Sequence, residues 1–167
     1  MEFRKSTIND MPDIMNIFKQ AQSYFKENRI DQWQNNYPNE NVISNDIKNN
    51  DSYVMVLNDK VIATIFASFE EEITYNKIYD GKWLNDDDYC VIHRIAVDNS
   101  FKGQGIFYKL IKNVEKLCKS KGIHTIKVDT HEDNITMQNT LNKNGFKYCG
   151  VIYLEDGDKR VAYQKNI

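Results

Sequence analysis

The sequence predicts a mixed α/β fold, in which a central sheet of parallel and antiparallel strands carries helices on both faces. Apolar stretches with the spacing of strands and with the spacing of helices alternate along the chain. Residues 89–97 are apolar on both faces except for His93 and Arg94, as in a central strand. One long amphipathic helix separates this strand from the next, so the two strands must pair in parallel through a right-handed crossover.

A short strand and a long helix are predicted at the beginning of the chain. The strand covers residues 2–5. Asn9 or Asp10 then caps the helix, because their side chains accept hydrogen bonds from bare backbone N–H groups, and Pro12 falls in the first turn. The apolar residues that follow at helical spacing are Ile14, Ile17, Phe18, Ala21 and Phe25.

The next predicted elements are a loop, a short helix and a hairpin. Residues 31–38 break the helical pattern and are expected to be irregular. Residues 41–48 are predicted to form a short second helix. Residues 53–57 and 61–69 are two strands joined at Asn58-Asp59, a residue pair that favours tight hairpin turns.

The middle of the chain holds a polar insertion, the central strand and the long helix. Residues 70–88 are polar with scattered aromatic side chains and show no regular period. After the central strand, a helix is predicted over residues 104–121, and Gly122 ends it. The apolar stripe of this helix consists of Ile106, Leu110, Val114 and Leu117.

The last part of the chain is predicted to add three strands and a short helix. Residues 124–130 form the strand that follows the crossover helix, and residues 134–142 form the short helix. Residues 146–154 and 160–164 are expected to form a final hairpin around Asp156-Gly157.

The composition is that of an ordinary globular protein. Of the 167 residues, 41% are hydrophobic and 28% are charged, and the formal net charge is -2. This length, without repeats or an interdomain linker, predicts one domain over residues 1–167. The balanced charge predicts neither a nucleic-acid partner nor a membrane partner, because such partners need a basic surface.

The cysteines and the N-terminus predict a reduced, cytoplasmic compartment. Cys90, Cys118 and Cys149 are odd in number, far apart and outside any C-x-x-C motif, which argues against a disulfide framework and against a zinc site. The first five residues lack the apolar core of a signal peptide. No apolar stretch of the sequence is long enough to span a membrane.

The most informative segment joins the central strand to the long helix. It ends in Gly103-Gln104-Gly105, and glycines at a helix start let a ligand approach bare N–H groups at the positive end of the helix dipole. This predicts an anion site for a phosphate or pyrophosphate. A Walker A loop would need Gly-Lys-Ser/Thr, which is absent, and a dinucleotide fingerprint would need a glycine in place of Tyr108.

Two motifs, and the order of elements over nearly the whole chain, resemble the GNAT superfamily of N-acetyltransferases, which bind acetyl-CoA. Residues 102–107, preceded by residues 95–98, are similar to that family's Arg/Gln-x-x-Gly-x-Gly/Ala loop. Residues 134–146 are similar to its Asn-x-x-Ala-x-x-Leu-Tyr-x-Lys-x-Gly-Phe segment. The positions that match in this second motif are Asn134, Lys143, Gly145 and Phe146.

The resemblance implies a GNAT-like fold with a splayed parallel strand pair, acetyl-CoA as cosubstrate and no metal. It implies direct transfer of an acetyl group, in a ternary complex, to a primary amine of a small molecule or a peptide, and we expect a monomer or a homodimer. Asn134 is also placed to cap the helix that it opens. The CoA-binding residues carried over from the motifs are Ile95, Ala96, Val97, Lys102, Gly103, Gln104, Gly105, Ile106, Phe107 and Asn134.

Three positions depart from the family pattern. Lys102 replaces Arg or Gln, which keeps a cation near the phosphate but loses a forked donor. Phe107 replaces Gly or Ala and crowds the helix start. Leu141 replaces a tyrosine that is thought, in many members, to protonate the leaving thiolate. These departures keep open an alternative function, a catalytically weak CoA-binding sensor or structural module.

His93 is the candidate catalytic base. It lies two residues before Ile95, on the same face of the predicted strand, and a neutral imidazole accepts a proton from an amine directly or through water. Residues 93–97 are similar to the His-x-Leu-Ala-Val stretch of arylalkylamine N-acetyltransferases, which implies a role in proton removal. The alternative is a hydrogen-bonded core histidine. For His131, after the next strand, helix capping is favoured over proton relay.

The two irregular segments supply candidate residues for binding the amine acceptor, namely Gln32, Trp33, Tyr79 and Trp83. Aromatic side chains hold an organic amine by stacking or cation–π contact, and each of them is equally suited to closing the core. The acidic run Glu70-Glu71-Glu72 either attracts a cationic amine or forms a solvated surface. Arg94 and Asp98 are predicted to be structural ions.

Overall fold

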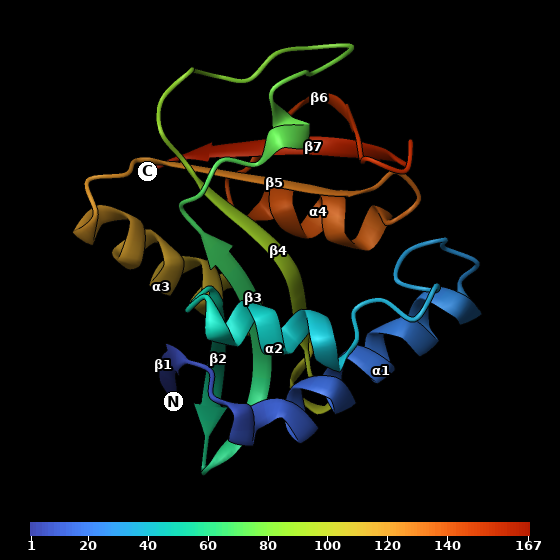
Figure 1. Cartoon of the computed structure of the whole chain (residues 1–167), viewed down its shortest axis with the longest axis vertical. Helices are drawn as coiled ribbons and strands as arrows, with labels where there is room; N and C mark the ends of the chain where they lie inside the picture. Colours follow the sequence, from blue (N-terminus) through green and yellow to red (C-terminus); the bar gives the residue numbers. More distant parts are fainter. The chain divides into compact units, whose positions relative to one another are not determined.

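The structure is a computed structural model that describes all residues from Met1 to Ile167 (Figure 1). It confirms the mixed α/β class, with four α-helices and seven strands in the order β1-β2-β3-β4-β5-β7-β6. The chain divides into two compact units. The first unit comprises Met1–Ala67 and His93–Asn113, and the second comprises Ser68–Ile92 and Val114–Ile167. The single domain expected over residues 1–167 stays a prediction.

The first unit is built on antiparallel strands with two helices packed against them (Figure 1). β1 pairs with β2 and β2 pairs with β3, and the turn residues Asn58 and Asp59 have φ of 50° and 61°, as a tight hairpin requires. The elements are β1 (Glu2–Lys5), α1 (Met11–Glu27), α2 (Glu40–Lys48), β2 (Ser52–Leu57), β3 (Lys60–Ser68), the later part of β4 (Cys90–Val97) and the first half of α3 (Ile106–Ser120).

The core of the first unit forms because α1 turns one apolar face towards the sheet. Ile14, Ile17 and Phe18 are fully buried at helical spacing, in one cluster with Ile43 of α2 and Val54 of β2. Burial of each such side chain contributes about 1.5–3 kcal/mol to stability. α1 has 17 residues, and none of the helices is long and apolar enough to cross a membrane.

The N-terminus of α1 is held by Asp10, although not through the predicted cap hydrogen bond. The Asp10 carboxylate accepts two hydrogen bonds of 2.8 Å from the Arg4 guanidinium and one of 2.7 Å from the Thr7 N–H. The hydrogen bond from Arg4 lowers the pKa of Asp10 from 3.8 to about 2; burial opposes this effect and Thr7 supports it. The carboxylate therefore favours the folded state while it is ionised.

We expect the stability of the fold to depend on Asp10 except in strong acid. Because the folded pKa lies below the unfolded value, the stabilisation is complete above about pH 4 and is lost as the pH falls through about 2. Asp10→Asn should therefore lower Tm at neutral pH and change it little near pH 2, as measured by circular dichroism. Asp31→Asn, at an exposed loop position, is the control and should change neither value. An equal loss for Asp10→Asn at both pH values would contradict this account.

The second unit contains the early part of β4, the second half of α3 and every later element. β5 (Thr125–His131) pairs in parallel with β4 at Cys90↔Ile126 and Val91↔Lys127, which confirms the predicted crossover, and the ladder extends no further. β7 (Lys159–Asn166) lies between β5 and β6 (Lys147–Tyr153) and is antiparallel to both. α4 (Ile135–Lys143) runs alongside these strands (Figure 1). The unit buries three free cysteines, Cys90, Cys118 and Cys149.

The polar insertion between β3 and β4 is fastened to β6. It is irregular apart from one 3-10 turn, η2 (Ile73–Tyr75). The backbone of Tyr79 exchanges two hydrogen bonds with Val151, of 2.8 and 2.7 Å. A Cβ atom at Gly81 would collide with the carbonyl of Cys149, so only glycine permits this close approach. The insertion therefore has a defined position in the second unit.

Candidate active site

The loop between β4 and α3 has the geometry that its glycines predict. Gly103 and Gly105 have φ of 76° and 72°, in the left-handed region that glycine adopts without steric cost. α3 begins at Ile106, two residues later than predicted, because these glycines keep the preceding chain out of the helical conformation. The loop belongs entirely to the first unit.

Four consecutive backbone N–H groups of this loop, those of residues 103–106, donate no hydrogen bond within the protein. The first backbone hydrogen bond that joins the loop to α3 runs from the Lys109 N–H to the Gly105 carbonyl, at 3.1 Å. Open space borders the loop, since a Cβ atom on Gly103 or on Gly105 would meet no atom within 4 Å. Bare donors at a helix start that face open space suit a phosphate group.

Asp98 fixes the chain just before the loop. Its carboxylate accepts hydrogen bonds from the Ser100 N–H at 2.9 Å and from Gln20 at 3.4 Å, and it lies 3.4 Å from the Lys60 ammonium. Burial alone would raise the pKa of Asp98, but these hydrogen bonds and the charge of Lys60 hold it below its ordinary value. The prediction of a structural ion is confirmed. Gln104 adds a hydrogen bond of 3.0 Å from its side chain to the Ser100 carbonyl.

The side chains that flank the loop anchor it to the first unit. Lys102 is exposed, and its ammonium lies 5.2 Å from the centre of the Tyr24 ring, which leaves a cation beside the loop. Ile106 is buried and Phe107 is half-buried at the start of α3. In β4, Ile95 and Ala96 are buried and Val97 is half-buried. Residues 95–97 come after Val91, the last residue of β4 that pairs with β5.

β4 departs from regular strand geometry at Arg94, next to the candidate base. Arg94 has φ of 47°, a left-handed conformation that is rare for a residue other than glycine. This interrupts the regular alternation from which His93 and Ile95 were predicted to share a face. The His93 ring is half-buried and stacks on Phe66, with 5.7 Å between the ring centres.

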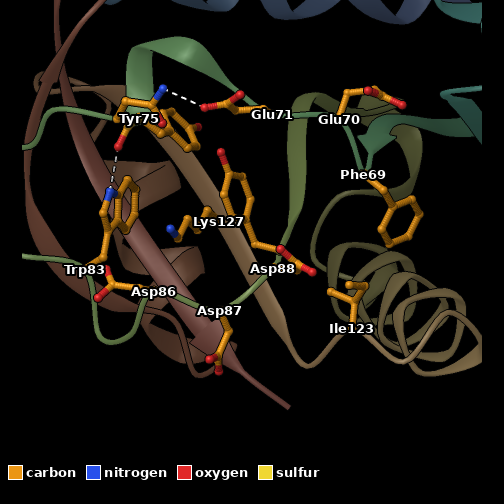
Figure 2. A pocket seen from close by; sticks show the side chains of 12 residues that line it. Phe69, Glu70, Glu71, Tyr75, Trp83, Asp86, Asp87, Asp88, Ile123 and Lys127 are labelled. Carbon is orange, nitrogen blue, oxygen red and sulfur yellow. Dashed lines mark hydrogen bonds between the residues drawn. The ribbon is translucent and has the colours of Figure 1, made fainter.

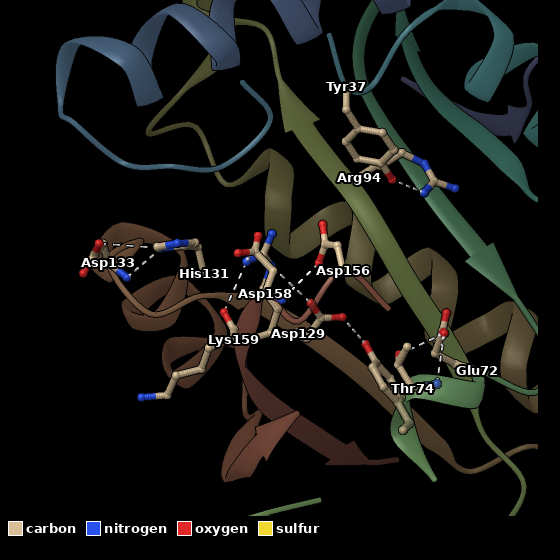
Figure 3. Close-up of polar contacts among 12 residues, drawn as sticks. Tyr37, Glu72, Thr74, Arg94, Asp129, His131, Asp133, Asp156, Asp158 and Lys159 are labelled. Carbon is tan, nitrogen blue, oxygen red and sulfur yellow. Dashed lines mark hydrogen bonds and ion pairs between the residues drawn. The ribbon is translucent and has the colours of Figure 1, made fainter. Parts of the chain in front are cut away.

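Arg94 is held by a buried ion pair with Asp46 of α2. Its Nε and Nη2 donate to the two carboxylate oxygens at 2.9 and 2.8 Å. Its Nη1 donates to the Tyr37 hydroxyl at 2.7 Å, a contact drawn in Figure 3. The guanidinium also lies 4.4 Å from the centre of the Phe66 ring. Phe66 thus contacts both Arg94 and His93. The prediction that Arg94 is a structural ion is confirmed.

Removing one member of this ion pair is expected to destabilise the protein strongly. Both side chains are only 12% exposed, and Arg94→Met would leave the Asp46 carboxylate buried without its partner. Loss of one partner of a buried pair typically costs about 3–5 kcal/mol. We expect a loss of this size in the free energy of unfolding measured in urea. Arg4→Met, which breaks the more exposed pair with Asp10, is the control, and an equal or larger loss there would contradict the prediction.

The predicted acceptor residues of the first unit lie in the loop after α1. Trp33 packs edge-to-face against Phe18 and Phe25, with 5.4 Å between ring centres in both pairs. These contacts favour the alternative in which Trp33 closes the core. Gln32 is half-buried beside it, and its carbonyl accepts a hydrogen bond of 3.0 Å from the Gln34 side chain. Acceptor binding by these two residues stays a prediction.

The other two predicted acceptor residues lie in the second unit. Tyr79 is 38% exposed, and its ring meets the Tyr153 ring edge-on at 5.2 Å. Trp83 is half-buried and donates a hydrogen bond of 2.9 Å from Nε1 to the Tyr75 carbonyl. Its ring also faces Lys127. Acceptor binding by Tyr79 and Trp83 likewise stays a prediction.

Asn134 and His131 both act locally at the end of β5 in the second unit. The Asn134 side chain accepts a hydrogen bond of 3.1 Å from the Met137 N–H, so it caps α4 as the alternative predicted. His131 Nδ1 accepts a hydrogen bond of 3.1 Å from the Asp133 N–H, also drawn in Figure 3. This contact precedes the helix, so the side chain that caps α4 is that of Asn134 and not that of His131. A contact of Asn134 with CoA stays a prediction.

Sequence reasoning missed two buried polar side chains of the second unit. The Tyr75 hydroxyl donates to Asp129 at 2.5 Å. Burial raises the pKa of Tyr75 well above its ordinary value, and the nearby Asp129 raises it further. Lys127 is 5% exposed, although lysine usually extends into solvent. A signal for Lys127 was present, because it is a charged residue directly between the apolar residues Ile126 and Val128 of a predicted strand.

Comparison with known proteins decides the family. Residues 12–146 match the sequence profile of the Acetyltransferase (GNAT) family, and this range contains the glycine loop and 135 of the 167 residues. The chain belongs to the GNAT acetyltransferase family. A GNAT-family acetyltransferase from Streptococcus agalactiae is 34% identical, with a TM-score of 0.90 over 99% of this chain and 95% of that chain.

More distant structures share the GNAT fold. A GNAT-family acetyltransferase from Listeria monocytogenes is 20% identical, with a TM-score of 0.74 over 99% of this chain and 94% of that one. The PaiA N-acetyltransferase from Thermoplasma acidophilum, solved in complex with coenzyme A, is 18% identical, with a TM-score of 0.72 over 99% and 98% of the two chains. At these identities the likeness shows the fold alone. The GNAT resemblance drawn from the two motifs is confirmed.

Proposed function

We propose that this GNAT protein is an acetyl-CoA-dependent N-acetyltransferase that acetylates a primary amine of a small molecule or a peptide. The reaction is direct attack in a ternary complex, and the protein is cytoplasmic and a monomer or homodimer. The observation that carries the proposal is the loop of residues 103–106, whose four bare N–H groups border open space. Membership of an acetyltransferase family and the coenzyme A complex of the PaiA structure support it.

The residues of the loop fit a CoA pyrophosphate. The N–H groups of residues 103–106 and the positive end of the α3 dipole suit its negative charge, and Lys102 adds a cation beside them. Residues 95–97 would hold the pantetheine arm through their backbone groups, and Asn134 joins the set through the family motif. When bound, acetyl-CoA supplies an acetyl group activated as a thioester.

His93 is proposed to take the proton from the acceptor amine. An amine with a pKa of ~10.4 is neutral in only about one molecule in 10³ at pH 7, so a base that removes the proton is needed. A neutral imidazole nitrogen accepts that proton directly or through one water. Half-burial of His93 and its stacking on Phe66 support this role, because a catalytic base must be held in a fixed orientation.

Leu141 favours a second candidate function. It lies in α4, is fully buried and carries no proton to donate, so it cannot act as the acid that a tyrosine supplies at this position in many members. A thiol has a pKa of only ~8.5, so thiolate departure without an acid is compatible with turnover. The alternative is a CoA-binding sensor or structural module with little catalysis.

The release of CoA thiol tests the proposed function. The chain is mixed with acetyl-CoA and a panel of alkylamines, arylalkylamines, amino acids and peptides, and free thiol is followed with a colorimetric reagent. We expect thiol release that depends on one class of amine and on an intact glycine loop. Tight CoA binding without release by any amine would overturn the proposal and establish the binding module instead.

A further inference from the structure

A pocket of about 570 Å³ lies in the second unit, between the insertion after β3 and the beginning of β5 (Figure 2). This volume falls within the range of about 300–1,000 Å³ that is usual for small-molecule sites. Aromatic side chains form much of its wall, with Tyr75 and Trp83 5.2 Å apart between ring centres. Of the residues that line this pocket, only Trp83 is among the predicted acceptor-binding residues, and the proposed acetyl transfer assigns no role to the others.

A buried lysine lines the pocket and faces its aromatic wall. The Lys127 Nζ lies 4.1 Å from the centre of the Tyr89 ring and 4.4 Å from that of the Trp83 ring. Lys127 is 5% exposed, and its side chain forms no ion pair and no hydrogen bond in the protein. Burial lowers its pKa, and the charges of Asp86 and Asp87 oppose this. An ammonium carries three donors, so an occupant that offers an acceptor would satisfy them.

The rim of the pocket has the opposite charge. Five carboxylates line it, in two groups that come from the two ends of the insertion: Glu70 and Glu71, and Asp86, Asp87 and Asp88. All five are exposed, and none of them pairs with Lys127. Glu71 accepts a hydrogen bond of 2.7 Å from Asn76, which orients one carboxylate of the rim. The pocket therefore has a cationic inner wall and an anionic mouth.

This arrangement selects against ligands with only one sign of charge. A dianion would meet five carboxylates at the rim. A dication would be repelled by the Lys127 ammonium, which already fills the space between the Trp83 and Tyr89 rings where a cation would bind best. A molecule with both charges satisfies both ends of the pocket.

We propose that this pocket binds a small dipolar molecule of the amino-acid class, with its carboxylate on the Lys127 ammonium and its cationic group among the carboxylates of the rim. Phe69 and Ile123 also line the pocket, so an apolar stretch between the two charges of the ligand is accommodated. An amino acid whose amino group is separated from the carboxylate by an alkyl chain has this pattern.

Three ligands of one chain length test the proposal. Isothermal titration calorimetry of the full chain, without acyl-CoA, would compare aminohexanoate with diaminohexane and adipate. We expect aminohexanoate to bind at least about tenfold more tightly than either, because only it pairs with both ends of the pocket. Equal or tighter binding of the diamine or of the diacid would overturn the proposal, as would the absence of any binding.

Substitutions at Lys127 and at the rim test where each of the two charged groups of the ligand binds. Lys127→Met keeps the alkyl stem and removes the donor, and we expect it to weaken aminohexanoate binding by about tenfold or more. Lys112→Met is the control. Lys112 lies in the first unit, with its ammonium 5.6 Å from the centre of the Tyr108 ring, and its replacement should leave aminohexanoate binding unchanged. If Lys127→Met fails to fold, the double variant Glu70→Gln, Glu71→Gln tests the rim instead. It is also expected to weaken aminohexanoate binding.

Unchanged affinity in both the lysine and the rim variants would overturn the proposal. The inference does not depend on the proposed acetyl transfer, since the titration uses no acyl-CoA. If no amine causes thiol release but aminohexanoate binds, only the proposed function is contradicted. If amines cause thiol release but aminohexanoate does not bind, only the proposal for the pocket is contradicted.

Discussion

Gly105→Val is expected to abolish CoA binding and leave the fold intact. A Cβ atom at residue 105 would enter the open space that borders the loop, where no other part of the protein lies within 4 Å. The branched side chain would therefore contact the ligand rather than the protein. Valine also adopts a φ of 72° only with strain, so the substitution would shift the loop backbone from its present geometry. We expect the Kd for CoA, measured by calorimetry, to rise by about 100-fold or more, which corresponds to about 2.7 kcal/mol.

A matched control separates ligand exclusion from backbone strain. Gly122, at the end of α3, also has φ of 72° and no atom within 4 Å of a Cβ. Gly122→Val should therefore incur the same strain, about 1–3 kcal/mol, and should lower Tm equally without changing the affinity for CoA. If Gly105→Val kept the wild-type affinity, the CoA site would lie elsewhere.

His93→Ala is expected to lower kcat by about 10²–10⁴-fold, the usual effect of losing a general base. The KM for acetyl-CoA should change little, because the proposed CoA contacts come from residues 95–97 and 102–107. Steady-state rates of thiol release at varied acetyl-CoA concentration measure both kcat and this KM.

His124→Ala is the control for this experiment. His124 is exposed, precedes β5 and has no role in the proposed chemistry, so kcat and the KM for acetyl-CoA should remain those of the wild type. A near-wild-type rate for His93→Ala would return His93 to the alternative of a core histidine that stacks on Phe66.

Elements that depend on neighbouring residues were predictable from the sequence. The turn at Asn58-Asp59, the cap at Asn134 and the glycine loop each follow from the backbone preferences of a few adjacent residues, and the structure has all three. The buried stripe of α1 also follows from local spacing. For the same reason the CoA loop is the part of the candidate site that sequence reasoning describes best.

Features that depend on distant residues were not predictable. The pair of Arg94 with Asp46 joins residues 48 positions apart, and the bond of Tyr75 with Asp129 joins residues 54 apart. No local preference favours a left-handed arginine in a strand. The interrupted alternation next to His93 therefore goes with the contacts of Arg94 to Asp46 and Tyr37, which are distant in sequence. Likewise, the rings that enclose Lys127 come from the insertion, whose path along β6 no periodicity describes.

The conformation of Arg94 has a consequence for how this family member can change during evolution. The φ of 47° suits glycine, asparagine or aspartate, whereas the three hydrogen bonds to Asp46 and Tyr37 require a guanidinium. No other amino acid meets both demands: the residues that relax the backbone leave a buried carboxylate unpaired, and lysine keeps the charge but loses the fork. Sequence drift at position 94 is therefore open only to lineages in which position 46 has lost its charge first.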